Sequence, residues 1–229
     1  MNQQVTKAIV LKRINYGEAD RIITVLTLDC GKLRLMVKAA RRVNSKLAGG
    51  IEFFSVSNIS FVRGRGEIGT LTSARLIDHF GEIAKDIERT MAGYQFIKQV
   101  DKLTEDESDD TWFNLLQQTM KILNNKTISL ESIHIWFSLQ LLRHSGNVPE
   151  LDKDEFGKKL LPDVDYDFDY QKMTFRLSPK GSYSSDHIKF LRLTLVSVSP
   201  RALQDSESND KIISDSLVLL STMIKLHLS

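Results

Sequence analysis

The fold is decided by the stretch Arg21-Ile-Ile-Thr-Val-Leu-Thr27, the residues Asp29-Cys-Gly-Lys32 and the run Leu33-Arg-Leu-Met-Val37. The first run is β-branched and apolar and predicts a strand, and the last run alternates as a second strand does. The residues between them have the composition of a hairpin turn, in which Gly31 can take a positive φ. The stretch therefore predicts an antiparallel pair of strands.

Strand patterns continue on both sides of this pair. A strand is expected at Val5–Ile14, ahead of a turn at Asn15–Glu18, and two more are expected at Phe54–Phe61 and Ile68–Ala74. Five short strands with basic connections fit a small closed barrel of the oligonucleotide-binding (OB) type, which has no free sheet edges. An SH3-like barrel or a small sandwich has similar periodicity, so the residues alone leave these alternatives open.

After about residue 78 the spacing of apolar residues becomes helical. Gly146 and Pro149 end the third helix. A small irregular β-containing insert is expected at residues 150–185. The predicted class is α+β, with an OB domain at 1–80 and a helical domain at 81–229. The expected helices are Ile83–Leu103, Thr111–Leu123, Ser129 or Glu131 to His144, Ser185–Val198 and Asp210–Leu228.

Composition narrows the class of protein further. No apolar run approaches the roughly 18–20 residues of a membrane span, and the first residues lack the layout of a signal peptide. A single cysteine, Cys30, cannot form an internal disulfide. The single thiol and the lack of these segments indicate a reducing cytoplasm, without a membrane span.

Charge is distributed unevenly along the 229 residues. Residues 1–80 carry 13 Lys and Arg against 6 Asp and Glu, whereas residues 81–229 carry 18 against 23. Two turn-rich segments concentrate the positive charge: a predicted hairpin, Lys38–Gly50, and the turn Arg63–Gly66. Cations on the turns of a rigid sheet suit a phosphate backbone better than a small substrate. The candidate nucleic-acid-binding residues are Lys38, Arg41, Arg42, Lys46, Arg63 and Arg65, followed by Arg21, Arg34, Lys12 and Arg13.

Sequence motifs give no sign of catalysis. The chain has no phosphate-binding Gly-x-x-x-x-Gly-Lys-Ser/Thr motif and no His-Glu-x-x-His, and its five histidines lack the spacing of metal ligands. Four aspartates, Asp163, Asp165, Asp167 and Asp169, alternate with apolar residues and predict one acidic strand face. A solvent-facing edge explains them better than a cation site, because a flat strand does not converge oxygen ligands. We expect neither an enzyme nor a cofactor.

Aromatic residues of the predicted barrel have two possible roles. Phe53, Phe54 and Phe61 can stack on bases in a groove or pack inward. Cys30 lies in a predicted turn and is read as an incidental thiol.

Several of these segments resemble the bacterial DNA repair and recombination mediator family RecO. The resemblance is carried in order by Tyr16-Gly-Glu-Ala-Asp-Arg-Ile22, Gly31-Lys-Leu-Arg34, Lys38-Ala-Ala-Arg-Arg42, Leu47-Ala-Gly-Gly50, Arg63-Gly-Arg-Gly66 and Leu71-Thr. Gly146-Asn-Val-Pro-Glu-Leu-Asp152 and the ending Leu226-His-Leu extend it through the helical part.

The resemblance implies an OB barrel followed by a helical domain. It implies single- and double-stranded DNA as ligands and annealing of complementary strands. It also implies that the partner RecR helps to load RecA, an indirect partner, onto strands coated by single-strand-binding protein (SSB). The acidic C-terminal tail of SSB would bind the helical domain. The resemblance further implies a bacterial cytoplasmic protein that is associated with the nucleoid.

One departure from the family concerns zinc. Many members carry two Cys-x-x-Cys pairs after the Leu-Asp of this region, but here the first pair reads Asp154 and Gly157, and Ser178–Asp186 has no cysteine. A structural zinc site is not expected without the four thiolates. We expect packing alone, including the alternating Asp and aromatic residues, to hold the insert.

Three functions remain open at this stage. The leading hypothesis is a non-enzymatic binder of single-stranded DNA. The second is an adaptor whose barrel contacts RecR or a similar protein instead of DNA. The third is an RNA-binding barrel.

Overall fold

The computed structural model describes residues 3–64, 66–104, 110–200 and 210–228. The chain divides into two compact units, Met1–Asn125 and Lys126–Ser229. Helices α1 (Ile87–Leu103) and α2 (Asp110–Leu123) therefore belong to the same unit as the N-terminal strands. The division at residue 80 made from the sequence stays a prediction.

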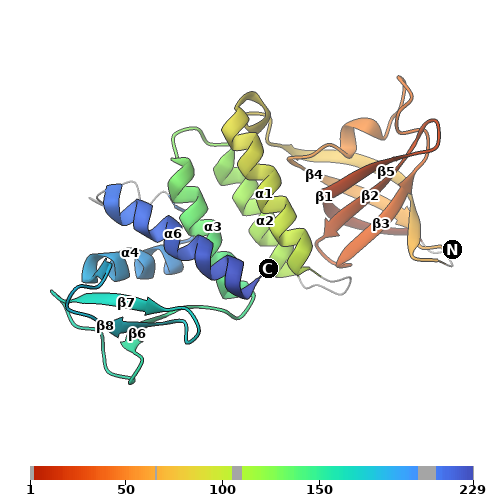
Figure 1. The fold of residues 1–229 in the computed structure, drawn as a ribbon. Helices are drawn as coiled ribbons and strands as arrows, with labels where there is room; N and C mark the ends of the chain where they lie inside the picture. The colour runs from red at the N-terminus through yellow and green to blue at the C-terminus, as the bar shows by residue number, and fades with distance from the viewer. Residues whose placement is uncertain (1–2, 65, 105–109, 201–209, 229) are drawn as a thin grey trace. The chain divides into compact units, whose positions relative to one another are not determined.

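The first unit contains the predicted closed barrel, with strands in the order β1-β2-β3-β5-β4 (Figure 1). Neighbouring strands are antiparallel except β3 and β5, whose parallel pairing closes the barrel. Its strands are β1 (Gln3–Tyr16), β2 (Asp20–Thr27), β3 (Lys32–Val37), β4 (Ser55–Val62) and β5 (Ile68–His79).

Several bounds and one connection of the predicted strands are wrong. β5 ends at His79 and not at Ala74, and β1 begins at Gln3 and not at Val5. Tyr16 belongs to β1, and the following turn is confined to Gly17–Ala19, where Gly17 has a φ of 54°. The segment Lys38–Gly50 is not a hairpin, because β3 pairs with β2 and β5 and not with β4. The predicted β2–β3 hairpin is confirmed, and Gly31 has the expected positive φ, 67°.

Alternation along the strands separates the inside of the barrel from its outside. Ile23, Val25, Leu35, Val37 and Phe61 are fully or almost fully buried in the barrel core. The intervening residues therefore point outward, since successive side chains of a strand lie on opposite faces. Figure 1 shows the curved sheet that these strands form.

Helices cover one end of the outer face. Ile9 and Leu26 are register partners that point away from the core, yet both are fully buried. Helix α1 contacts β1, and α2 contacts β1 and β2, which accounts for this burial. Helix α1 begins at Ile87 and not at Ile83, because Asp86 accepts the Arg89 N–H as N-cap and Ile83–Lys85 forms a 3₁₀ turn.

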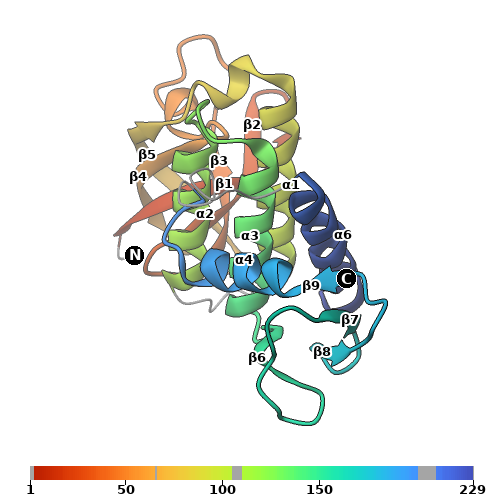
Figure 2. The ribbon, with the colours of Figure 1, turned by 90° about the vertical axis from the view of Figure 1, so that its left-hand side faces the viewer.

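The second unit combines helices with a small sheet (Figure 2). Helix α3 (Leu130–His144) begins after Ser129, whose side chain accepts the Ser132 N–H. Helices α4 (Ser185–Val196) and α6 (Asp210–His227) pack against α3 and end slightly earlier than predicted. The sheet has the order β6-β8-β7-β9, from β6 (Glu150–Asp154), β7 (Asp165–Asp169), β8 (Thr174–Leu177) and β9 (Tyr183–Ser184).

The insert holds its shape by packing and by carboxylate hydrogen bonds. Tyr166 and Phe168 of β7 are buried against Phe175, as the alternation of acidic and aromatic residues predicts. Asp154, one of the two positions that the resemblance compares with a cysteine pair, accepts the N–H groups of Phe156 and Lys158 at 2.9 and 2.8 Å. Packing alone is therefore too narrow an account of this segment.

The described part of the chain contains neither a membrane-spanning helix nor a cluster of metal-ligating side chains. None of the helices there is long and apolar enough to cross a membrane. No group of three or more His, Cys, Asp or Glu side chains in those residues lies close enough together to hold a metal ion.

Candidate nucleic-acid interface

The segment Lys38–Leu47, called here the basic loop, leaves the end of β3. Its cations Lys38, Arg41, Arg42 and Lys46 are all exposed. A hollow of about 570 Å³ is lined by residues of this loop, including Lys38, Arg42 and Lys46. The structure thus brings three of the predicted DNA-binding residues around one depression.

The basic loop has a defined backbone. The Asp20 carboxylate accepts the Ala39 N–H at 2.7 Å, and Ala39 has a φ of 55°. The Arg41 N–H donates to the Ala19 carbonyl at 2.9 Å, and the Arg41 guanidinium donates to the Gly17 carbonyl at 3.3 Å. The β1–β2 turn therefore holds the start of the basic loop.

The end of the basic loop is fixed by close packing. A 3₁₀ turn, Ala48–Gly50, follows it and lies against β5. A Cβ placed on Gly50 would come within 2.5 Å of the Ala74 Cβ, whereas one on Gly49 would meet nothing within 4 Å. Gly50 is required here because the backbone approaches β5 more closely than a side chain allows.

The second basic turn joins β4 to β5. Arg63 is exposed, and Arg65 lies outside the described residues. A second hollow, of about 560 Å³, has Lys32, Arg34 and Arg63 in its wall, together with two acids, Asp29 and Glu67. The Arg34 guanidinium lies 3.7 Å from the Glu67 carboxylate, a pair exposed enough to be weak.

The remaining candidates divide between two faces. Lys12 and Arg34 point outward, because both pair in register with Thr24. Arg21 lies on the opposite face beside Asn15, whose Oδ1 accepts the Arg21 Nε–H at 3.2 Å. Arg13 also lies on this second face, where it donates to Glu52 at 2.6 Å and stands 4.4 Å from the ring centroid of Phe53.

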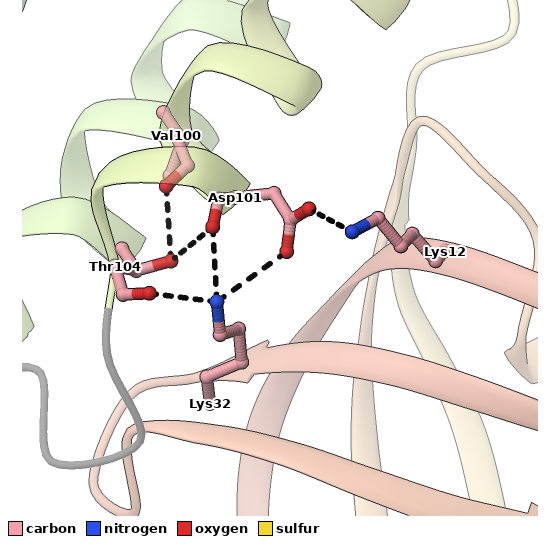
Figure 3. Close-up of polar contacts among 5 residues, drawn as sticks. All are labelled: Lys12, Lys32, Val100, Asp101 and Thr104. Carbon is pink, nitrogen blue, oxygen red and sulfur yellow. Dashed lines mark hydrogen bonds and ion pairs between the residues drawn. The ribbon is translucent and has the colours of Figure 1, made fainter. Parts of the chain in front are cut away.

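Lys12 is engaged in an ion pair that the sequence did not reveal (Figure 3). Its Nζ lies 2.5 Å from one oxygen of Asp101, a buried carboxylate of α1. Lys32 approaches the other oxygen at 3.5 Å and donates to the carbonyls of Asp101 and Thr104. This pairing makes Lys12 a weaker candidate for phosphate contact than the cations of the basic loop.

The aromatic candidates of the barrel and Cys30 are partly or fully buried. Phe61 is buried in the barrel core, so inward packing is confirmed for this residue. Phe54 is buried outside that core, against Gly93 and Tyr94 of α1, and Phe53 contacts Arg13 and Tyr94. Cys30 is half-buried in the wall of the second hollow.

Two exposed cations of the barrel escaped the sequence analysis. Lys7 and Arg75 are both register partners of Asn58 and therefore flank it on one outer face of β1, β4 and β5. They are isolated in sequence, so charge clustering could not reveal them. Only the predicted strand order, combined with an exact register, would have brought them together.

The closed five-stranded barrel with cations in its connecting loops places the chain among proteins with an OB-type domain followed by helices. Family comparison is more specific. The family described as Recombination protein O N terminal matches residues 1–80, and Recombination protein O C terminal matches residues 84–229. The chain belongs to the RecO family.

Individual relatives agree with this membership. The DNA repair protein RecO of Alkaliphilus metalliredigens is 31% identical over 147 residues, 64% of this chain and 59% of that protein. The protein of the same name from Dehalococcoides mccartyi strain 195 is 32% identical over 163 residues, 70% and 64% of the two chains. That of a Roseiflexus species is 36% identical over 64% of this chain and 51% of its own. The chain spans between half and two thirds of the length of these relatives.

Proposed function

We propose that this chain binds single-stranded DNA through the basic loop and acts without catalysis in DNA repair and recombination. The single observation that carries the proposal is the arrangement of Lys38, Arg42 and Lys46. All three are exposed and line one hollow. Among the described residues, none of them has a side-chain hydrogen bond or an ion pair. Each can therefore neutralise a phosphate without first breaking an internal contact.

The fixed backbone of the basic loop supports this assignment. A cation on an ordered loop loses less conformational entropy on binding than one on an unstructured tail. Arg63 and Arg34, at the second hollow, would extend the positive surface along the barrel. OB folds bind oligonucleotides across strands β2 and β3 and the adjoining loops, which is where these cations lie.

Annealing of complementary strands is part of the same proposal. Two DNA strands repel each other through their phosphates, and a surface that neutralises both strands lowers that barrier. Relatives of the chain bear the name DNA repair protein RecO. With this membership we propose RecR, the SSB tail and, indirectly, RecA as partners.

Binding of a fluorescently labelled single-stranded oligonucleotide, followed by anisotropy, tests the proposal. We expect wild-type protein to bind at low salt and the triple variant K38A/R42A/K46A to bind at least tenfold more weakly, since three phosphate contacts are lost. The matched control is the double variant K158A/K159A, which removes two exposed lysines of the second unit. It should bind as wild type does.

Two results would contradict the proposal. Equal affinity of the triple variant and wild type would remove the basic loop from the site. Stronger binding to an RNA strand of the same sequence, measured in competition, would transfer the activity to RNA.

A further inference from the structure

An apolar row crosses the outer face of the barrel where the helices do not cover it. Ile14 of β1 pairs in register with Ile22 of β2, and Ile22 pairs with Met36 of β3. Register partners share a face, and this face is the outer one, because Ile23 and Leu35 point into the core. Ile14 is 59% exposed, while Ile22 and Met36 are half-buried.

Tyr16 continues this surface at the end of β1. It lies two residues beyond Ile14 and therefore on the same face. The residue is 55% exposed. In the described part of the chain, its side chain has no ring contact and no hydrogen bond. An unstacked aromatic ring on an OB barrel is the feature on which bases stack in single-strand binders.

Cations border this apolar surface on two sides. Next to Tyr16, the Gly17 carbonyl holds the guanidinium of Arg41, and the Asp20 carboxylate holds the residue that follows Lys38. On the other side, Lys12 and Arg34 occupy the adjoining register row. Lys12 is held by Asp101, so Arg34, which is only weakly paired with Glu67, is the main cation of this edge.

An apolar centre between cationic edges matches a single strand, with bases at the centre and phosphates at the edges. A duplex does not fit in the same way, because its bases are already paired and stacked. Glu18, exposed in the β1–β2 turn, adds one negative charge at the border and does not interrupt the apolar row.

We propose that Tyr16 is a stacking platform for an unpaired base, with Ile14, Ile22 and Met36 as the adjoining apolar surface. This inference rests on the proposed function and adds base recognition to phosphate binding. Its consequence is a preference for single strands that charge alone does not explain.

The variants Y16A and Y16F test this role against a labelled single-stranded oligonucleotide and its duplex. We expect Y16A to weaken single-strand binding about tenfold and Y16F to bind like wild type, because phenylalanine keeps the ring. Duplex affinity and the salt dependence of binding should not change in either variant. V5A, which alters an exposed apolar residue at the other end of β1, is the matched control and should have no effect.

A cross-linking experiment on wild-type protein gives a second, mutation-free readout. Irradiation with an oligonucleotide that carries 5-iodouracil should attach it to Tyr16, as located by mass spectrometry. Unchanged single-strand affinity of Y16A, or cross-links elsewhere only, would overturn the inference and leave this face to a protein partner. The proposed function fails separately, if wild-type protein binds no single strand at low salt.

Discussion

The Asp20 carboxylate accepts the backbone N–H of Ala39 at 2.7 Å and so ties the β1–β2 turn to the start of the basic loop. The two residues belong to segments that the family resemblance singles out separately. Their contact fixes the backbone at the start of the basic loop, from which Arg41, Arg42 and Lys46 extend.

Replacement of Asp20 tests this anchoring role, because anchoring and charge predict opposite changes in DNA affinity. The variant D20A removes a negative charge, which by electrostatics alone would strengthen DNA binding. We expect weaker binding instead, together with a loss of about 1–2 kcal/mol in the free energy of unfolding, because the Ala39 N–H loses its acceptor. D20N keeps an acceptor oxygen and should fall between D20A and wild type. Denaturant unfolding and anisotropy measure the two effects, and tighter binding by D20A would contradict the account.

The adjacent glycines of the 3₁₀ turn offer a matched pair of variants. G50A should lower the free energy of unfolding by about 2 kcal/mol, since its methyl group would overlap Ala74 and force the backbone to move. G49A should be nearly neutral, because its methyl group meets no atom within 4 Å. Thermal melts of both variants compare their stability with that of wild type. Equal destabilisation would show that the close approach of Gly50 to β5 is not what fixes this turn.

Asp101 should be more important for stability than for DNA binding. D101N leaves Lys32, which is mostly buried, without its negative partner, and we expect a loss of about 2 kcal/mol in the free energy of unfolding. K12A should change it by less than about 1 kcal/mol, since the Lys12 side chain is mostly exposed. Urea titrations measure both. A larger loss for K12A than for D101N would contradict this division of roles.

His134 should make the second unit sensitive to acid. Burial lowers the pKa of His134 from its ordinary value of 6.5, and Glu131 opposes that shift only in part. As the pH falls below 6.5, the unfolded chain therefore takes up a proton that the folded chain does not, and the free energy of unfolding decreases.

The variant H134Q isolates this contribution. Relative to wild type, it should become more stable as the pH falls from about 7.5 to about 5.5, because glutamine takes up no proton in this range. Unfolding in urea at the two pH values measures the change. A stability difference independent of pH would show that His134 does not titrate differently in the folded and unfolded chain.

Strands and helices were predictable wherever local pattern decides them. The run Arg21–Thr27 is rich in β-branched residues and forms most of β2, and Ser129 begins α3 as its N-cap. The first helix was extended too far, to Ile83, because the apolar period continues through a 3₁₀ turn that Asp86 separates from α1.

The sequence predicts which cations cluster in the candidate site, but not how their side chains are arranged in space. Neighbouring cations in the sequence identify the basic loop, but its turn residues predict a hairpin, since local pattern does not reveal that β3 pairs with β5. Lys12 and Arg13 were grouped although alternation places them on opposite faces. Only the tertiary structure brings Asp101 to Lys12, and no local pattern contains that contact.

The most direct test of the central claim compares the salt dependence of single-strand binding in wild type and in K38A/R42A/K46A. The slope of log affinity against log salt should be steeply negative in wild type and shallower by about 2 in the variant, at about 0.7 per lost phosphate contact. That result would assign the lost contacts to the basic loop. Identical slopes, or no binding by wild-type protein at low salt, would contradict a DNA site at these residues.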